Sequence, residues 1–158
     1  MTPVSLTVNG RKVAAMVEPR THLGDFLREH CRLTGTHLGC EHGVCGACTI
    51  LFDGRSARSC LMLAVQADGH ELLTVEGIAP SEDKLHVLQQ CFHEHHGLQC
   101  GFCTPGMIMS ALDIVRRKGN DLDERTVRVE LEGNICRCTG YHNIVKAIQA
   151  GAAAMKRL

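Results

Sequence analysis

Hydrophobic and polar residues alternate with a period of two near the start of the chain. Residues 4–8, VSLTV, follow this pattern, and the segment 11–17, RKVAAMV, returns after Asn9-Gly10. Alternation of this kind is typical of a half-buried strand, and Asn-Gly readily takes the positive φ angles of a two-residue hairpin turn. We therefore predict an antiparallel pair of strands at the N-terminus.

A second hairpin and one helix are expected in the rest of the first half. The segment 49–60, TILFDGRSARSC, contains Asp53-Gly54, which is another strong hairpin signal. Before it, residues 22–31 place apolar side chains on one helical face, and residues 71–77 form a last expected strand. A small sheet wrapped over a single helix is the arrangement of a β-grasp fold.

From Ser81 onward the apolar residues recur at helical spacing. Ser81 can cap a first helix that carries Leu85, Leu88 and Phe92 on one face and ends at Gly97. Three further helices are expected: one with Thr104 as its N-cap and Pro105 as its first residue, running to Gly119, one between Asp123 and Gly133, and one from Thr139 to the end of the chain. Four helices of this length make a compact bundle.

The patterns together predict an α+β chain of two domains. We expect an N-terminal β-grasp domain over residues 1–77 and a C-terminal four-helix bundle over residues 78–158, with the linker in residues 75–83. A chain of 158 residues is long enough for two small domains. With no Trp, one Tyr and four Phe, such domains lack large aromatic anchors, and metal centres could supply the missing stability.

The loop 39–49, GCEHGVCGACT, carries the first candidate chemistry. Cys40, Cys45 and Cys48 have the C-x4-C-x2-C spacing of a plant-type [2Fe–2S] cluster, which takes a fourth cysteine from elsewhere. The backbone must wrap closely around such a cluster, often with positive φ angles, and glycine permits both. The loop supplies Gly39, Gly43 and Gly46.

The second hairpin provides the fourth thiol. If Asp53-Gly54 forms the turn, Cys48 lies opposite Ser59, and Cys60 then lies one step from Cys48. A four-cysteine zinc site fits this first loop less well than a [2Fe–2S] cluster does, because the spacing is the plant-type one.

A second group of four cysteines lies in the helical half. Cys100 and Cys103 form a C-x2-C pair, Cys136 and Cys138 form a C-x-C pair, and each pair is followed by a threonine at the expected start of a long helix. Two helix N-termini would then offer free N–H groups to one anionic object, such as a [2Fe–2S] cluster with four thiolates. By count alone, a four-cysteine zinc site fits this group about as well.

Charge and composition exclude several classes of function. The chain has 17 Lys and Arg against 17 Asp and Glu, so it lacks the basic surplus of a nucleic-acid-binding protein. No apolar run is long enough to span a membrane, and the segment MTPVSLTVNGRK lacks the apolar region of a signal peptide. We expect a cytoplasmic protein, in which ten cysteines indicate metal binding rather than disulfides.

The remaining candidates have simpler interpretations. Cys31 and Cys91 lie in predicted helices outside both groups, where a small buried hydrophobe is the expected role. The run His93–His96 is interpreted as a solvated helix end rather than a metal site. The sequence offers no nucleotide-binding glycine loop and no nucleophile–base pair, so we expect no catalytic residue in this chain.

Together the motifs resemble those of the small iron–sulfur subunits of the molybdenum hydroxylases, the family of xanthine dehydrogenase and carbon monoxide dehydrogenase. The resemblance covers nearly the whole chain and rests on GCEHGVCGACT, RSC at Cys60, GLQCGFCTPGMIM and GNICRCTGYHNIVKAI. It implies a plant-type ferredoxin-like β-grasp domain and a helical domain, each with one [2Fe–2S] cluster, and it favours iron over zinc. The implied ligands are Cys40, Cys45, Cys48 and Cys60 for one cluster, and Cys100, Cys103, Cys136 and Cys138 for the other.

The resemblance also implies partners. In this family a large subunit binds the molybdenum–pterin cofactor and performs the hydroxylation, and a medium subunit binds FAD. Gln99 and Cys138 match family residues that lie at the pterin, so the helical-domain cluster is expected on the molybdenum side and the other cluster toward the flavin. This chain would then pass single electrons from molybdenum to FAD or an external acceptor, within a heterotrimer or a dimer of heterotrimers.

Two alternatives stay open at this point. A stand-alone two-cluster ferredoxin-like carrier would keep an acidic surface for transient partners, whereas the charge of this chain is balanced. Within the family, a two-subunit form without a flavin subunit is the second alternative. The substrate is open as well, since relatives use carbon monoxide, aldehydes, purines, N-heteroaromatics or aryl-CoA thioesters, and the large subunit carries the specificity.

Overall fold

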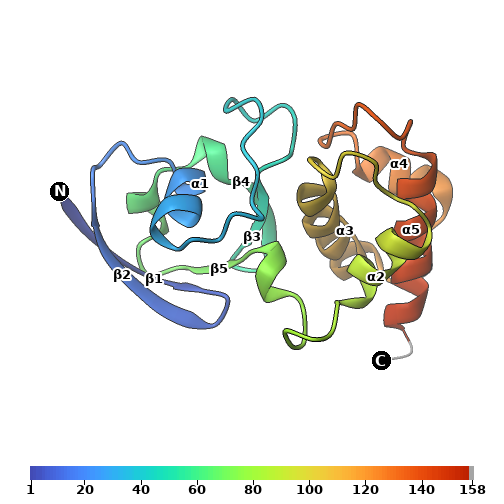
Figure 1. Cartoon of the computed structure of the whole chain (residues 1–158), viewed down its shortest axis with the longest axis horizontal. Coiled ribbons are helices and arrows are strands. Elements are labelled where there is room, and N and C mark those ends of the chain that lie inside the picture. Colours follow the sequence, from blue (N-terminus) through green and yellow to red (C-terminus); the bar gives the residue numbers. More distant parts are fainter. Residues whose placement is uncertain (157–158) are drawn as a thin grey trace.

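The two halves of the chain lie side by side, one built on a sheet and the other on helices (Figure 1). The structure, a computed structural model, describes residues 1–156. Among these residues, no helix has the length and apolar character needed to cross a lipid bilayer.

A mixed five-stranded sheet forms the first half. Its strands are β1 (Thr2–Val8), β2 (Arg11–Val17), β3 (Thr49–Phe52), β4 (Arg55–Arg58) and β5 (Glu71–Leu73), in the order β2-β1-β5-β3-β4. β1 and β5 run parallel, and the other neighbouring pairs are antiparallel. Both predicted hairpins are present, with positive φ angles at Asn9, Gly10, Asp53 and Gly54. β5 is shorter than predicted, because Val75–Gly77 form a 3-10 helix.

One helix packs against this sheet, as the sequence predicts. α1 (Leu23–Asp25) continues without a break into the π-helical turn Phe26–His30. The side chains of Leu23, Phe26 and Leu27 are fully buried against apolar residues of the sheet. Burial of side chains of this size stabilises the fold by about 1.5–3 kcal/mol each. Leu38, directly before the first cysteine loop, lies against Gly24 of this helix, since a Cβ on Gly24 would come within 2.6 Å of a Leu38 methyl carbon.

Four helices make up the second half, as predicted. They are α2 (Val87–Glu94), α3 (Thr104–Lys118), α4 (Glu124–Glu130) and α5 (His142–Met155). The four lie together on the right of Figure 1, with α5 packed against both α2 and α4. The Asp123 side chain caps α4 by accepting the Thr126 N–H over 2.6 Å.

The first of these helices starts later than predicted. Residues from Ser81 to Lys84 close a tight turn through the Lys84 N–H and the Ser81 carbonyl, so Ser81 does not cap a helix. His86 caps α2 instead, because its Nδ1 accepts the Leu88 N–H and its own N–H donates to Gln89 Oε1. The side chain of the predicted core residue Leu85 is consequently exposed.

The two longest helices start next to cysteine pairs. Cys103 is the N-cap of α3, and Thr104, which the sequence suggested as the cap, is the first helical residue. At α5 the N-cap is Tyr141, two residues beyond the predicted start at Thr139. The general prediction that each cysteine pair adjoins a helix N-terminus is confirmed, although both start positions differ.

Each half has its own hydrophobic core, and the two halves are in contact. The core of the sheet half includes Phe26 and Leu72, and the core of the helical half includes Phe92 and Ile144. Leu51 of β3 belongs to the second core, because α3 packs across β3. This contact places the first cysteine loop next to the start of α3.

Candidate metal centres

Backbone N–H groups surround the thiols of the first cysteine loop. The N–H groups of Val44 and Cys45 both donate to Cys40 Sγ over 3.3 Å, and the Ala47 N–H donates to Cys45 Sγ over 3.5 Å. Hydrogen bonds from the Cys45 and His42 N–H groups lower the pKa of Cys40 to about 6. These hydrogen bonds therefore favour the thiolate of Cys40, which is the form that binds iron.

Glycines shape this loop as predicted, in two different ways. Gly43 and Gly46 have φ angles of 81° and 76°, a region in which other L-residues are strained. Gly39 acts by close approach, since a Cβ there would lie 3.1 Å from Cys45 Sγ. The backbone can thus turn its amides toward the sulfur atoms only because these positions lack side chains.

The second hairpin brings Cys60 to the loop, as its register predicts. β3 and β4 pair Thr49 with Arg58, so Cys48 faces Ser59, whose N–H and hydroxyl both donate to the Cys48 carbonyl. The two thiols of Cys48 and Cys60 are neighbours and are buried. Burial, and then the adjacent Cys48 thiol, raise the pKa of Cys60 to about 11.

The second group of thiols is also gathered in one place. Burial raises the pKa of Cys103 to about 12, and the neighbouring Cys136 thiol adds to this effect. The Phe102 N–H, together with the Cys138 thiol, lowers the pKa of Cys100. Cys103 thus adjoins Cys136, and Cys100 adjoins Cys138, although the two pairs lie more than thirty residues apart in the sequence.

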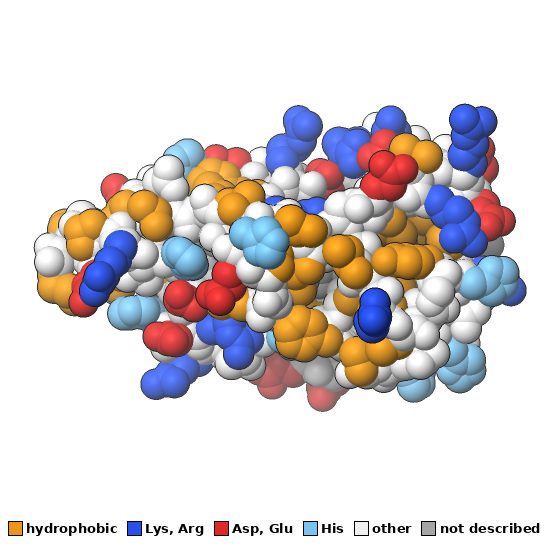
Figure 2. Space-filling model, turned by 90° about the horizontal axis from the view of Figure 1, so that it is seen from above, with side chains coloured by type: hydrophobic (Ala, Val, Ile, Leu, Met, Phe, Trp, Pro, Cys, Tyr) orange, Lys and Arg blue, Asp and Glu red, His pale blue; other side chains and the backbone are white. Residues whose placement is uncertain are grey.

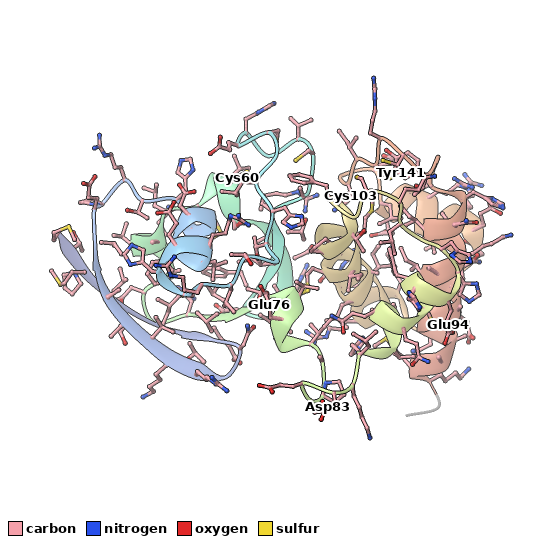
Figure 3. All side chains as sticks on the ribbon, in the orientation of Figure 1. Cys60, Glu76, Asp83, Glu94, Cys103 and Tyr141 are labelled. Carbon is pink, nitrogen blue, oxygen red and sulfur yellow. The ribbon has the colours of Figure 1, made fainter. Side chains whose placement is uncertain are left out.

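Polar contacts join the two cysteine regions to each other. The Ile135 N–H donates to the Cys45 carbonyl over 2.8 Å, and Asn134 Nδ2 donates to the Gly46 carbonyl over 3.1 Å. Arg58 donates to Thr49 Oγ1 and to the Gly133 carbonyl, over 2.6 Å in each case. Figure 3 shows Cys60 and Cys103 on the same side of the molecule, away from Asp83 in the linker.

Several of these contacts involve residues that the sequence did not single out. Asn134 is buried and is held from the helical half by Ser110, whose hydroxyl donates to Asn134 Oδ1 over 2.8 Å. The sequence signal that could have identified Asn134 is its place in the segment GNICRC, two residues before Cys136. His37 and Phe102 also meet across the two halves, with ring centroids 4.8 Å apart.

The donor sets fit [2Fe–2S] clusters. Each centre offers four thiols and N–H donors to sulfur, the features that anionic clusters require. The Thr104 hydroxyl oxygen, at the start of α3, is buried without a hydrogen-bond partner among the described residues, so it is free to donate to an anionic group. In residues 1–156 no three His, Cys, Asp or Glu side chains are arranged to hold a single metal ion.

The other candidate residues are placed as follows. Gln99 is exposed and adjoins the exposed Cys100. Cys91 is buried in α2 and Cys31 is half-buried, as expected for small hydrophobes outside the two centres. His93, His95 and His96 have exposed side chains at the end of α2, as expected for a solvated helix end.

Exposed hydrophobic side chains surround the cysteines. Five large hydrophobic residues within two positions of a cysteine of the two groups are exposed, and we call them the apolar collar: Val44, Leu61, Leu98, Phe102 and Ile135. Seen from the side on which the cysteine loops lie, hydrophobic side chains gather across the middle of the molecule, with many of the charged ones nearer its margins (Figure 2). Apolar surface of this kind commonly marks a binding site for another protein.

Comparison with known proteins supports the same assignment. Residues 6–74 match the family described as 2Fe-2S iron-sulfur cluster binding domain, and residues 74–149 match the family described as [2Fe-2S] binding domain. The chain is 58% identical to caffeine dehydrogenase subunit gamma of Pseudomonas sp. (strain CBB1), over 93% of this chain and 89% of that protein. It is 50% identical to the nicotine 6-hydroxylase small subunit of Paenarthrobacter nicotinovorans, over 92% and 86% of the two chains.

A solved structure shows the same fold. A chain in the crystal structure of quinoline 2-oxidoreductase from Pseudomonas putida 86 superposes with a TM-score of 0.94 and 51% identity, covering 99% of this chain and 96% of that one. The aldehyde oxidoreductase from Desulfovibrio gigas superposes with a TM-score of 0.92 and 38% identity, and there the match covers 17% of a longer chain. The family models, the relatives and the fold agree, and the protein belongs to the small iron–sulfur subunits of the molybdenum hydroxylases.

Proposed function

We propose that this chain is the electron-transfer subunit of a molybdenum-containing hydroxylase or dehydrogenase. It carries single electrons from a molybdenum–pterin site on a large partner subunit, through two [2Fe–2S] clusters, to FAD on a medium subunit or to an external acceptor. The observation that carries this proposal is the pair of four-thiol centres, which meet where the two halves pack together. The reaction on the substrate takes place on the partner, so the oxidoreductase activity belongs to the complex.

The ligands are assigned from the two thiol groups. We infer that one cluster is held by Cys40, Cys45, Cys48 and Cys60, and the other by Cys100, Cys103, Cys136 and Cys138. The adjacency of the thiols and the N–H donors around them support this assignment. When bound, each cluster supplies a site that takes up and releases one electron.

We further propose that the halves are two domains, a plant-type ferredoxin-like β-grasp domain over residues 1–77 and a four-helix bundle domain over residues 78–158. The separate hydrophobic cores and the 3-10 turn Val75–Gly77 at the end of the sheet support this boundary. In electron transfer, the residues of this chain position the two centres relative to each other. Asn134 and Arg58 fix the first cysteine loop against the helical half, which holds the two centres at a constant separation.

The apolar collar supports docking on partner subunits. We place the molybdenum subunit against Leu98, Phe102 and Ile135 beside the second thiol group, and the flavin subunit against Val44 and Leu61 beside the first. Gln99, which is exposed and adjoins Leu98 in the sequence, then reaches the pterin, and Cys138 approaches the same cofactor. We propose a heterotrimer or a dimer of heterotrimers in the cytoplasm. A stand-alone ferredoxin-like carrier is less favoured, because it would leave the apolar collar in water.

The names of the relatives suggest the class of substrate. Caffeine, nicotine and quinoline, which name three of these relatives, are all nitrogen heterocycles. We therefore propose that the complex oxidises an N-heteroaromatic compound. The choice within this class belongs to the large subunit.

Isolation of the complex from its natural host tests the function. An affinity tag on this chain should bring down a large molybdenum-containing subunit and an FAD-containing subunit. The complex is then mixed rapidly with caffeine, nicotine or quinoline. At least one of them should reduce the [2Fe–2S] clusters, which is observed as a decrease of their absorbance. If the tagged chain is isolated without partners, yet transfers electrons at full rate as a 17.2 kDa monomer, the stand-alone carrier is correct instead.

A further inference from the structure

The hydroxyl of Thr139 lies against one sulfur of the second thiol group. Thr139 Oγ1 is 3.1 Å from Cys136 Sγ, and the Thr139 N–H donates to the same sulfur over 3.4 Å. Cys136 is only 9% exposed, so water adds little to the surroundings of this sulfur. Thr139 thus offers two potential donors to Cys136 Sγ, beside the Cys138 N–H and the Cys103 thiol.

Neighbouring groups decide which atom donates in the contact between the hydroxyl and the thiol. The Tyr141 N–H donates to Thr139 Oγ1 over 3.1 Å, which uses one lone pair of that oxygen. A cysteine that binds iron is a thiolate and has no proton to give. The hydroxyl proton of Thr139 must then point at Cys136 Sγ.

The backbone holds Thr139 in this position. Gly140 and Tyr141 have φ angles of 64° and 68°, so the chain turns back sharply before α5 begins. The Tyr141 hydroxyl oxygen accepts the Cys136 N–H over 3.0 Å, which ties the end of the turn to its start. Tyr141 and Cys103 lie at the same end of the helical half in Figure 3, and the thiols of Cys103 and Cys136 are neighbours, so this turn adjoins the other cysteine pair.

The threonine that follows the other cysteine pair does not make this contact. Thr104 follows Cys103 in the sequence as Thr139 follows Cys138, but within residues 1–156 its hydroxyl has no hydrogen-bond partner. A hydrogen bond between a threonine hydroxyl and a thiol is therefore a particular feature of the turn before α5.

We propose that the Thr139 hydroxyl raises the reduction potential of the cluster held by the helical half. The inference rests on the proposed function, since it requires that cluster to take one electron from the molybdenum partner and pass it on. The electron adds one negative charge to the cluster. No covalent bond forms or breaks in this step, and no proton is transferred. A hydrogen bond donated to a ligand sulfur stabilises this added charge and so favours the reduced cluster.

Redox titration of the intact complex, followed by electron paramagnetic resonance, tests the proposal. Thr139→Val keeps the shape and the N–H of the residue and removes only the hydroxyl. The equilibrium constant for reducing the helical-half cluster should fall about tenfold, which equals a midpoint potential lower by about 59 mV for one electron. The potential of the cluster in the sheet half, measured in the same sample, should not move.

Thr139→Ser is the matched control. It retains the hydroxyl, and with it the acceptor for the Tyr141 N–H, so the parent potential should be kept. If Thr139→Val does not load its clusters, Thr139→Ala makes the same deletion in a smaller side chain and should show the same lower potential. Iron content is measured for every sample.

The outcomes separate this inference from the proposed function. Full iron loading with an unchanged potential in the variant without the hydroxyl overturns the role of Thr139 and leaves the proposed function in place. An equal fall in Thr139→Ser and Thr139→Val also overturns it, because the hydroxyl is then not the cause. Absence of iron from the parent complex overturns the proposed function itself.

Discussion

Gly46 provides a sharp test of how the first cysteine loop meets the helical half. Its φ angle is 76°, and a Cβ built on it would overlap the Gly133 carbonyl oxygen and lie 2.7 Å from Asn134 Nδ2. Gly54, in the β3–β4 turn, has a similar φ angle of 81°, but nothing lies within 4 Å of its Cβ position. The two glycines therefore share the conformational strain of an alanine substitution and differ in the steric contact.

The expected magnitudes follow from this difference. An alanine at either position lowers the free energy of unfolding by about 1–2 kcal/mol, because an L-residue is strained at positive φ. At Gly46 the overlap adds about 1–3 kcal/mol, as overpacking of a filled site does. Displacing Asn134 from the Gly46 carbonyl adds about 1 kcal/mol for the lost hydrogen bond. Gly46→Ala should therefore cost about 2–4 kcal/mol more than Gly54→Ala.

Thermal unfolding of the two variants, compared at equal iron content, measures this difference. In a protein of this size, 1 kcal/mol corresponds to about 2–4 °C, so Gly46→Ala should unfold at least about 4 °C below Gly54→Ala. It should also bind less iron in the sheet half, since the loop that carries three of the cysteines must move. Equal unfolding temperatures and equal iron contents would refute the reasoning that this loop packs tightly against the helical half.

Three further changes have distinct expected results. Cys48→Ser should lower the iron content from about four to about two atoms per chain, since one cluster is lost. Cys91→Ser, which lies outside both centres, should keep all the iron. An equal loss of iron in the two variants would refute the ligand assignment. Gln99→Leu should leave both clusters in place and slow their reduction by substrate in rapid-mixing experiments, and an unchanged rate at full iron content would exclude a role at the pterin. Burial raises the pKa of Asp113, but hydrogen bonds from Arg117 and from a serine of β4 outweigh it, so the pKa lies below its ordinary value. The stabilisation is therefore present at neutral pH and is lost as the pH falls through that lowered pKa. Arg117→Ala should destabilise the chain by about 1–3 kcal/mol at pH 7 and by less once the pH falls below that lowered pKa, where Asp113 takes up a proton in the parent protein as well; a loss that does not depend on pH would contradict this.

Much of the first centre could be predicted from the sequence, because local signals determine it. Asn9-Gly10 and Asp53-Gly54 require positive φ angles, and a two-residue turn then fixes the register of its strands. That register alone placed Cys60 beside Cys48. The position of Cys60 beside the first loop thus follows from turn chemistry.

The contacts between the halves could not be predicted in this way. Asn134 meets the Gly46 carbonyl across 88 positions of sequence, and no local pattern encodes a contact that depends on how two cores pack. The prediction that α2 starts at Ser81 was wrong for a related reason. Ser81 is a good helix cap in isolation, but the turn it closes with Lys84 and the cap supplied by His86 prevail in the folded chain.

The central claim is that this chain holds two [2Fe–2S] clusters on eight of its cysteines. Iron, zinc and acid-labile sulfide are measured together in the purified complex, with electron paramagnetic resonance of the dithionite-reduced sample. The account predicts about four iron atoms and four sulfides per copy of this chain, and signals from two distinct [2Fe–2S] centres. Stoichiometric zinc, or a single cluster signal with about two iron atoms, would contradict it.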